Sequence, residues 1–119
     1  MHAETYRIDP DTARRIGEAP RVVAVGTTVV RALESWAATG ELSGRTELFI
    51  HGDYPFAVVD RLLTNFHVPR SSLLVLVDAF LGGGGRWRAL YDTALAEGYR
   101  FLSFGDAMLV DRGHRDRGD

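Results

Sequence analysis

Hydrophobic and polar positions alternate along the chain with two periods, one typical of strands and the other typical of helices. Thr5–Ile8 and the β-branched run Arg21–Val25 predict short strands, the second of a kind buried on both faces of a parallel sheet. Between them, Asp9 followed by Pro10 predicts the N-cap and first turn of a helix that ends near Ala19.

A second helix is predicted directly after the second strand. It begins after Gly26-Thr27-Thr28 and ends near Thr39, where Gly40 stands at the position that commonly holds a C′ glycine. Its apolar positions at helical spacing are Val29, Val30, Leu33, Trp36 and Ala37.

The rest of the chain continues the alternation. The strands expected there are Thr46–His51, Arg61–His67, Tyr99–Phe104 and Ala107–Val110. The helices expected run from Ser71 or Ser72 to Phe80 or Leu81 and over Arg86–Glu97, on either side of the four-glycine hinge Gly82–Gly85. Glu41–Arg45 is predicted to be a loop. This order indicates an α/β fold over residues 1–110, followed by a disordered tail over residues 111–119.

Composition narrows the classes of function. The chain has 119 residues, one domain or a piece of a larger one, and its formal net charge is −2. It has no Cys, which excludes disulfides, thiolate nucleophiles and cysteine zinc sites. Its first residues are polar and its longest apolar run, Leu73–Val77, is too short to span a bilayer. We therefore expect a cytoplasmic protein with no membrane partner.

Polar residues follow two of the predicted strands. Gly26 lets a ligand approach the amides of a helix N-terminus, and the hydroxyls of Thr27 and Thr28 can bond a phosphate, a carboxylate or a ribose. The alternative is ordinary helix capping by threonine. Asp106 also follows a predicted strand, where a Gly-Asp pair is equally typical of a hairpin turn.

The segment from Thr64 to Ser71 carries the densest group of polar side chains. It holds Asn65, the only Asn in a chain without Gln, together with His67 and Arg70. Ligands of open α/β sheets bind at the carboxyl ends of strands, and His67 can act there as a general acid or base. The alternative has Asn65 in a turn, His67 in the core and Ser71 as a helix cap.

Two further patterns favour ordinary structure. Arg31 and Glu34 lie one turn apart and are expected to pair on a solvated helix face. The four His residues have no i, i+4 pairing and no carboxylates at ligand spacing, so we expect no metal site.

Three long stretches carry a resemblance to a known family. The S-adenosylmethionine:tRNA ribosyltransferase-isomerase family of queuosine biosynthesis is resembled by RVVAVGTTVVRALES, by the segment from Leu48 to Leu74 and by YRFLSFGDAMLV. MHAETY resembles an internal stretch of the same family, so the resemblance runs from Met1 to about Val110. It covers roughly the last third of the family's length, the C-terminal part of an α/β domain that carries an inserted β-barrel.

The resemblance implies a specific reaction. Family members transfer the ribosyl part of S-adenosylmethionine to 7-aminomethyl-7-deazaguanine at the wobble position of tRNA, and they release adenine and methionine. The product is an epoxycyclopentanediol on the base, known as epoxyqueuosine. S-adenosylmethionine is then a substrate, and no cofactor or metal is implied. The partners implied are the modified tRNA and a chain that carries the missing N-terminal part, or a second copy of this chain.

The resemblance also implies site residues. Asn65 and His67 are expected to be catalytic, with His67 as the general base. The residues expected to bind the donor, the wobble base or a phosphate are Gly26, Thr27, Thr28, Arg31, Thr64, Arg70, Ser71 and Asp106.

The sequence departs from the family pattern at four places. The loop between Ala19 and Arg21 is shorter than usual. His51-Gly52-Asp53-Tyr54 replaces Tyr-Pro-Gly-Tyr, Asp78 replaces a Ser, and Gly82–Gly85 replaces a stretch of small and charged residues. Asp78 puts a carboxylate into an apolar helix. An alternative function is therefore a truncated or accessory fragment, without catalysis of its own, that needs a partner chain.

Overall fold

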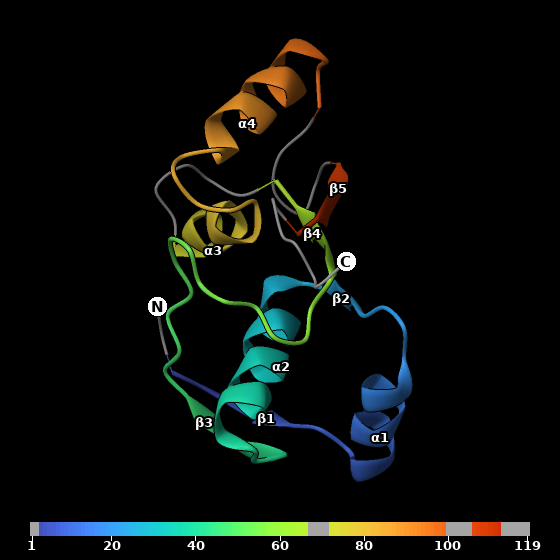
Figure 1. Cartoon of the computed structure of the whole chain (residues 1–119). Coiled ribbons are helices and arrows are strands. Elements are labelled where there is room, and N and C mark those ends of the chain that lie inside the picture. The colour runs from blue at the N-terminus through green and yellow to red at the C-terminus, as the bar shows by residue number, and fades with distance from the viewer. Residues whose placement is uncertain (1–2, 67–71, 100–105, 113–119) are drawn as a thin grey trace.

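The computed structural model describes residues 3–66, 72–99 and 106–112, and it confirms the predicted α/β class (Figure 1). Its elements in chain order are β1 Glu4–Arg7, α1 Pro10–Glu18, β2 Val23–Val25, α2 Thr27–Thr39, β3 Ser43–Thr46, β4 Arg61–Asn65, α3 Ser72–Phe80, α4 Trp87–Ala96 and β5 Ala107–Asp111.

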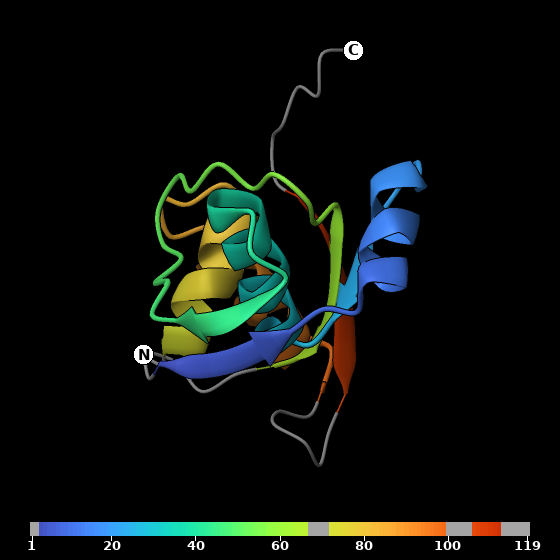
Figure 2. The ribbon, with the colours of Figure 1, turned by 90° about the horizontal axis from the view of Figure 1, so that it is seen from below.

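Two small sheets organise these elements. In the larger one the strand order is β2-β4-β5, with β2 parallel and β5 antiparallel to β4. The smaller sheet is the antiparallel pair β1-β3. Figure 2 shows α2 and α3 on one side of the larger sheet and α1 on the other.

The larger sheet buries one face. Side chains that point toward the helices are buried, namely Ala24, Leu62, Thr64, Met108 and Val110. Those that alternate with them are exposed, among them Val23 and Val25 of β2. The prediction that the Arg21–Val25 strand is buried on both faces is therefore wrong, because Val23 and Val25 stay exposed although α1 lies on their side of the sheet.

The helix boundaries follow the sequence signals closely. Asp9 caps α1 by accepting from the Asp11 amide at 3.1 Å, as predicted. Gly40 ends α2 in the left-handed conformation, with φ of 78°, and donates to the Trp36 carbonyl at 2.7 Å.

The strand predicted over Thr46–His51 is wrong, and so is the loop predicted over Glu41–Arg45. The strand lies earlier, over Ser43–Thr46, where it pairs with β1. The Thr46 hydroxyl accepts from the Leu48 amide at 3.0 Å, and the Leu48 carbonyl accepts from Arg31 Nε at 3.0 Å. Both main-chain groups of Leu48 are thus bound by side chains, which ends the strand.

Two buried charged side chains of α2 hold distant segments in place. The Glu34 carboxylate accepts from the amides of Ala57, Val58 and Val59 at 2.8–3.0 Å. Arg31 bonds the Leu48 carbonyl and forms an ion pair with Glu4. Both side chains are buried, so the prediction that they pair on a solvated face is wrong. Each of these side chains binds groups that are distant in the sequence, and the two do not pair with each other.

Three of the four departures from the family pattern, at Gly52, Asp78 and Gly82–Gly85, contact one another. Asp78 accepts from the Gly85 amide at 3.1 Å and from the Trp87 amide at 2.9 Å, so its carboxylate anchors the glycine loop and the start of α4. Gly83 packs on the main chain of Gly52, where an added Cβ would lie 2.7 Å from the carbonyl oxygen. The loop Gly82–Gly85 has positive φ throughout, which explains its composition.

The C-terminal end of the fold extends past its predicted limit. Asp111 is the last residue of β5, and Arg112 donates to the Phe56 carbonyl at 2.6 Å. The expected disorder is therefore wrong for these two residues, and residues 113–119 lie outside the described part. Most of the strand predicted over Tyr99–Phe104 also lies outside it.

We predict that Glu34→Gln destabilises the protein by about 2–3 kcal/mol, because the introduced amide would face main-chain N–H groups that need an acceptor. Urea denaturation measures this change. Glu47→Gln is the matched control, because Glu47 is exposed, and it should leave stability within about 0.5 kcal/mol. Equal effects of the two substitutions would contradict the role assigned to Glu34.

The same variant should change the titration of Tyr54. Burial, and secondarily the negative charge of Glu34, raise the pKa of Tyr54 above its ordinary value of 10.0. Glu34→Gln removes the second cause, so the pKa of Tyr54 should fall while staying above the ordinary value. Ultraviolet absorbance titration measures it, with Tyr54→Phe identifying the signal. An unchanged or higher pKa would contradict the coupling.

A pair of glycine substitutions tests the contact between the two departing loops. Gly83 and Gly84 have similar φ values, 79° and 71°, but only Gly83 approaches Gly52. Gly84→Ala should cost about 1 kcal/mol from backbone strain alone. Gly83→Ala should cost at least about 1 kcal/mol more, because the methyl group would displace the Gly52 carbonyl. Equal thermal unfolding temperatures of the two variants would contradict the contact.

Candidate functional site

The carboxyl ends of β2 and β4 meet at one edge of the larger sheet, because the two strands are parallel. The Gly26 amide donates to the Leu63 carbonyl at 2.9 Å, which holds the start of α2 against the end of β4. Asn65 of β4 pairs with Ala107, the first residue of β5, so Asp106 lies at the same edge. Residues from three predicted site segments are thereby brought together.

The N-terminus of α2 is open at this edge. Gly26 is its N-cap residue, with φ of 95°, and supplies no side-chain hydrogen bond. The first turn has no acidic residue. The first amides of a helix lack intrahelical acceptors and carry partial positive charge, so this end can receive an anionic or carbonyl oxygen.

The predicted residues at the edge divide into two groups by burial. Thr28, Asn65 and Asp106 are exposed, whereas Thr27 and Thr64 are buried toward the helices. Strand alternation explains the division in β4, because Thr64 and Asn65 point to opposite faces of the sheet. The Asn65 carboxamide makes no hydrogen bond with any residue that the structure describes, so its donors and acceptors are available to a ligand.

Other predicted site residues are not at this edge or not described. The Arg31 guanidinium is buried against Leu48 and Glu4, so the structure does not bring it to the ligand side of the edge. His67, Arg70 and Ser71 lie outside the described residues.

A groove of about 630 Å³ starts beside the edge residue Thr28. It lies between β1, α1, β2 and α2. Its lining is largely apolar on the side of Val23 and Val29 and polar on the side of Asp9 and Thr12. This groove was not predicted from the sequence, because its walls come from four elements and form only where these elements pack together.

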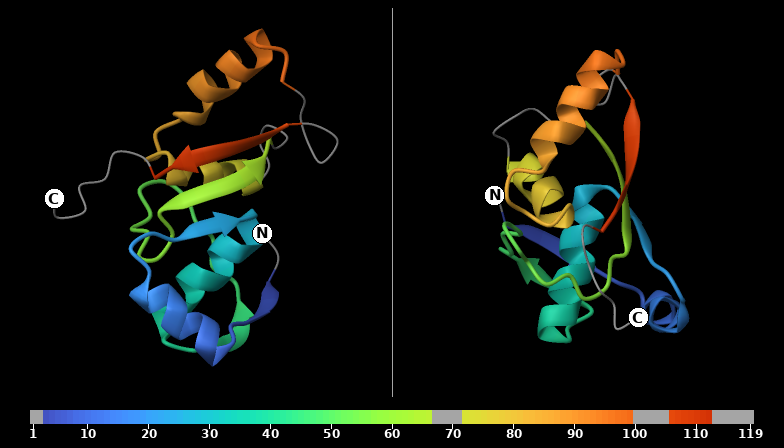
Figure 3. Two further views of the ribbon diagram at one scale, coloured as in Figure 1. Left: turned by 90° about the vertical axis from the view of Figure 1, so that its right-hand side faces the viewer. Right: turned by 45° about the horizontal axis from the view of Figure 1, so that its top comes forward.

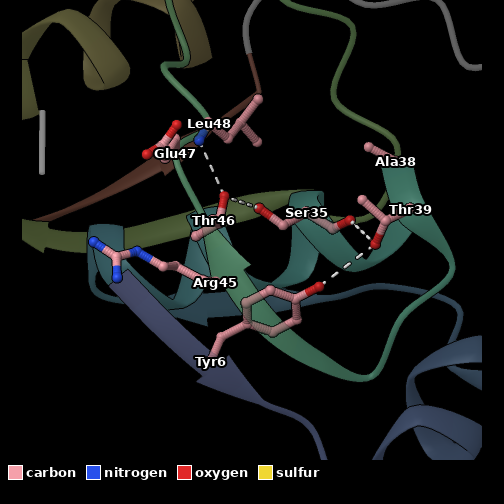
Figure 4. Close-up of a pocket in the computed structure, with 8 residues that line it drawn as sticks. All are labelled: Tyr6, Ser35, Ala38, Thr39, Arg45, Thr46, Glu47 and Leu48. Atoms are coloured by element: carbon pink, nitrogen blue, oxygen red, sulfur yellow. Dashed lines mark hydrogen bonds between the residues drawn. The ribbon is translucent and has the colours of Figure 1, made fainter. Parts of the chain in front are cut away.

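A second cavity, of about 280 Å³, lies between the smaller sheet and α2 (Figure 4). Its hydroxyl groups bond one another and the main chain. Ser35 Oγ bonds Thr46 Oγ1 at 2.6 Å, and the Tyr6 hydroxyl donates to the Glu41 carbonyl at 2.9 Å. These contacts explain how β3 is held on α2, and they assign the hydroxyls a structural role.

Two kinds of feature are missing from the described part of the chain. Among residues 3–66, 72–99 and 106–112, no three His, Asp or Glu side chains gather in a way that could hold a metal ion. None of the helices in the same ranges has the length and apolar character needed to cross a membrane.

Comparison with known proteins gives matches along nearly the whole chain. A family model described as queuosine biosynthesis protein matches residues 1–110. The S-adenosylmethionine:tRNA ribosyltransferase-isomerase of Rubrobacter xylanophilus is 56% identical over 115 residues, which cover 97% of this chain and 34% of that protein. The protein of the same name from Thermus thermophilus is 56% identical over 122 residues, covering 92% of this chain and 34% of its own length.

A solved structure agrees with these matches. The crystal structure of S-adenosylmethionine tRNA ribosyltransferase from Thermotoga maritima superposes with a TM-score of 0.82 at 46% identity, covering 88% of this chain and 40% of that one. The chain thus spans about a third of the length of the curated relatives it matches. Because the family model covers all but nine of its 119 residues, the chain belongs to the queuosine biosynthesis protein family.

Proposed function

We propose that this chain forms part of an S-adenosylmethionine:tRNA ribosyltransferase-isomerase. The reaction moves the ribosyl group of S-adenosylmethionine onto 7-aminomethyl-7-deazaguanine in the tRNA anticodon, giving epoxyqueuosine and releasing adenine and methionine. The observation that carries the proposal is the family match over residues 1–110, in which the curated relatives bearing that name are 50–56% identical.

The sheet edge offers groups suited to such substrates. The open amides of α2 and the Thr28 hydroxyl fit a carboxylate or phosphate oxygen, groups that methionine and tRNA both carry. The Asn65 carboxamide presents donors and acceptors in fixed geometry, which suits the edge of a purine or the hydroxyls of a ribose. Thr27 and Thr64, which are buried, position the start of α2 and the end of β4 in this scheme.

The reaction also needs a base. It removes a proton next to the sulfonium of the donor or from the attacking amine. His67 follows Asn65 by two residues and remains our candidate for this base, because an imidazole can accept and donate a proton. Arg70 and Ser71 remain candidates for contacts with an anionic group of the donor or of tRNA.

The role of Asn65 can be tested in a full-length chimera. In it, this chain replaces the matching segment of the Rubrobacter relative. We expect Asn65→Ala to lower kcat/KM for adenine release by about 10–100-fold, the effect of losing one or two hydrogen bonds to substrate. Thr28→Val should lower it in the same direction.

Thr93→Val supplies the matched control, because Thr93 lies on the exposed surface of α4. It should leave kcat/KM unchanged. If Asn65→Ala stays within about threefold of the parent chimera, Asn65 does not contribute to the reaction as proposed.

A further inference from the structure

One face of the smaller sheet carries two arginines and two hydroxyl groups side by side. Thr5 of β1 pairs with Arg45 of β3, and Arg7 pairs with Ser43. Side chains at alternate positions of a strand point to the same face, so these four share one face of the sheet. All four residues are exposed. We call them the basic face.

The opposite face of the same sheet is turned toward α2. Ser35 Oγ bonds Thr46 Oγ1 at 2.6 Å, and the Tyr6 hydroxyl lies 3.5 Å from the Thr39 hydroxyl. Figure 4 shows these hydroxyls gathered in the cavity, while the Arg45 guanidinium points away from them. The contacts with α2 therefore decide which face of the sheet is turned outward, and it is the face that holds the arginines.

The positive charge of the basic face has no partner in the described part of the chain. Among residues 3–66, 72–99 and 106–112, neither Arg7 nor Arg45 forms an ion pair, in contrast to Arg14, Arg31, Arg61 and Arg112. Guanidinium and hydroxyl groups both donate hydrogen bonds to phosphate oxygens, and these are the side chains that commonly contact a nucleic-acid backbone.

The acidic residues nearest in the sequence do not lie on the basic face. The Glu4 side chain belongs to the opposite face, where it pairs with Arg31. Asp9 lies beyond the end of β1 and accepts from an amide of α1, and Glu47 follows the last residue of β3. The four residues of the face thus present two positive charges and no negative charge.

A groove joins the basic face to the candidate site. Thr5 and Arg7 line the groove of about 630 Å³ that also contains Thr28, a residue of the sheet edge. Figure 3 (left) shows the smaller sheet beside α1 and α2, at the end of the molecule opposite α4. A nucleic-acid strand that places one base at the sheet edge can therefore continue across the groove and meet the basic face with its backbone.

We propose that the basic face binds the phosphate backbone of the tRNA whose base enters the candidate site, an inference that rests on the proposed function. Arg7 and Arg45 donate to phosphate oxygens, and the hydroxyls of Thr5 and Ser43 add further donors. The shared groove favours RNA over an acidic polypeptide, because the tRNA is the partner that has to reach both places. Contacts of this kind fix the position of a nucleic acid without reading its sequence.

The test measures how tightly the full-length chimera binds fluorescently labelled tRNA that carries 7-aminomethyl-7-deazaguanine. Fluorescence anisotropy at several KCl concentrations gives the affinity and its dependence on salt. Arg7→Gln and Arg45→Gln should each weaken binding by about 3–10-fold. Each should also lower the slope of log affinity against log salt by about one, because each removes one phosphate contact.

Arg88→Gln is the matched control, because it removes the same charge from an exposed arginine of α4. It should leave the affinity within about twofold of the parent and the slope unchanged. Circular dichroism melting checks that all three variants keep their fold.

Three outcomes would overturn the proposal while the parent chimera binds tRNA and releases adenine. The first is parent-like affinity and slope in both variants, and the second is weaker binding at an unchanged slope. The third is parent-like binding combined with a lower melting temperature, which would assign the basic face to a contact within the protein. If the parent chimera itself does not bind this tRNA, the proposed function fails, and the inference fails with it.

Discussion

The buried Glu34 carboxylate is the interaction on which the arrangement of this chain depends. It accepts hydrogen bonds from the three main-chain amides of residues 57–59. These bonds hold the segment that leads into β4 against the middle of α2. Moving this carboxylate would cost free energy, because the three amides would lose their acceptor in the interior of the protein. One turn earlier, Arg31 ties the same helix to Leu48 and β1. Helix α2 therefore connects both sheets, and its own N-terminus opens at the candidate site.

Three of the departures from the family pattern, at Gly52, Asp78 and Gly82–Gly85, depend on one another. The acidic side chain at Asp78 finds main-chain donors in the glycine loop, and that loop can adopt its positive φ values only because it is built of glycine. The loop in turn packs on Gly52, at a distance that excludes a side chain at position 83. The carboxylate, the glycine run and the altered turn thus depend on one another within the fold.

The sequence predicted the local features of the fold better than its long-range polar contacts. The ends of α1 and α2 follow from Asp9 and Gly40, whose effects act within one helical turn. The burial of Glu34 could not be predicted, because its acceptor role needs amides 23–25 residues away. The position of β3 was missed for a similar reason, since Ser43–Thr46 has no strand periodicity and forms a strand only through pairing with β1. The meeting of Gly26–Thr28 with Asn65 was predictable from parallel strand ends, whereas the opposite orientations of Thr64 and Asn65 depend on which face of the sheet is covered.

The chain spans about a third of the length of its curated relatives, and the proposed function places its candidate site where β2 and β4 end. The measurement that tests this most directly is adenine release from S-adenosylmethionine in the presence of tRNA that carries 7-aminomethyl-7-deazaguanine. We predict that the 119-residue chain alone releases no adenine above background and that the full-length chimera does. Release by the chain alone at the rate of the chimera would contradict the proposal that this chain forms only part of the enzyme and would place the whole reaction centre within these residues.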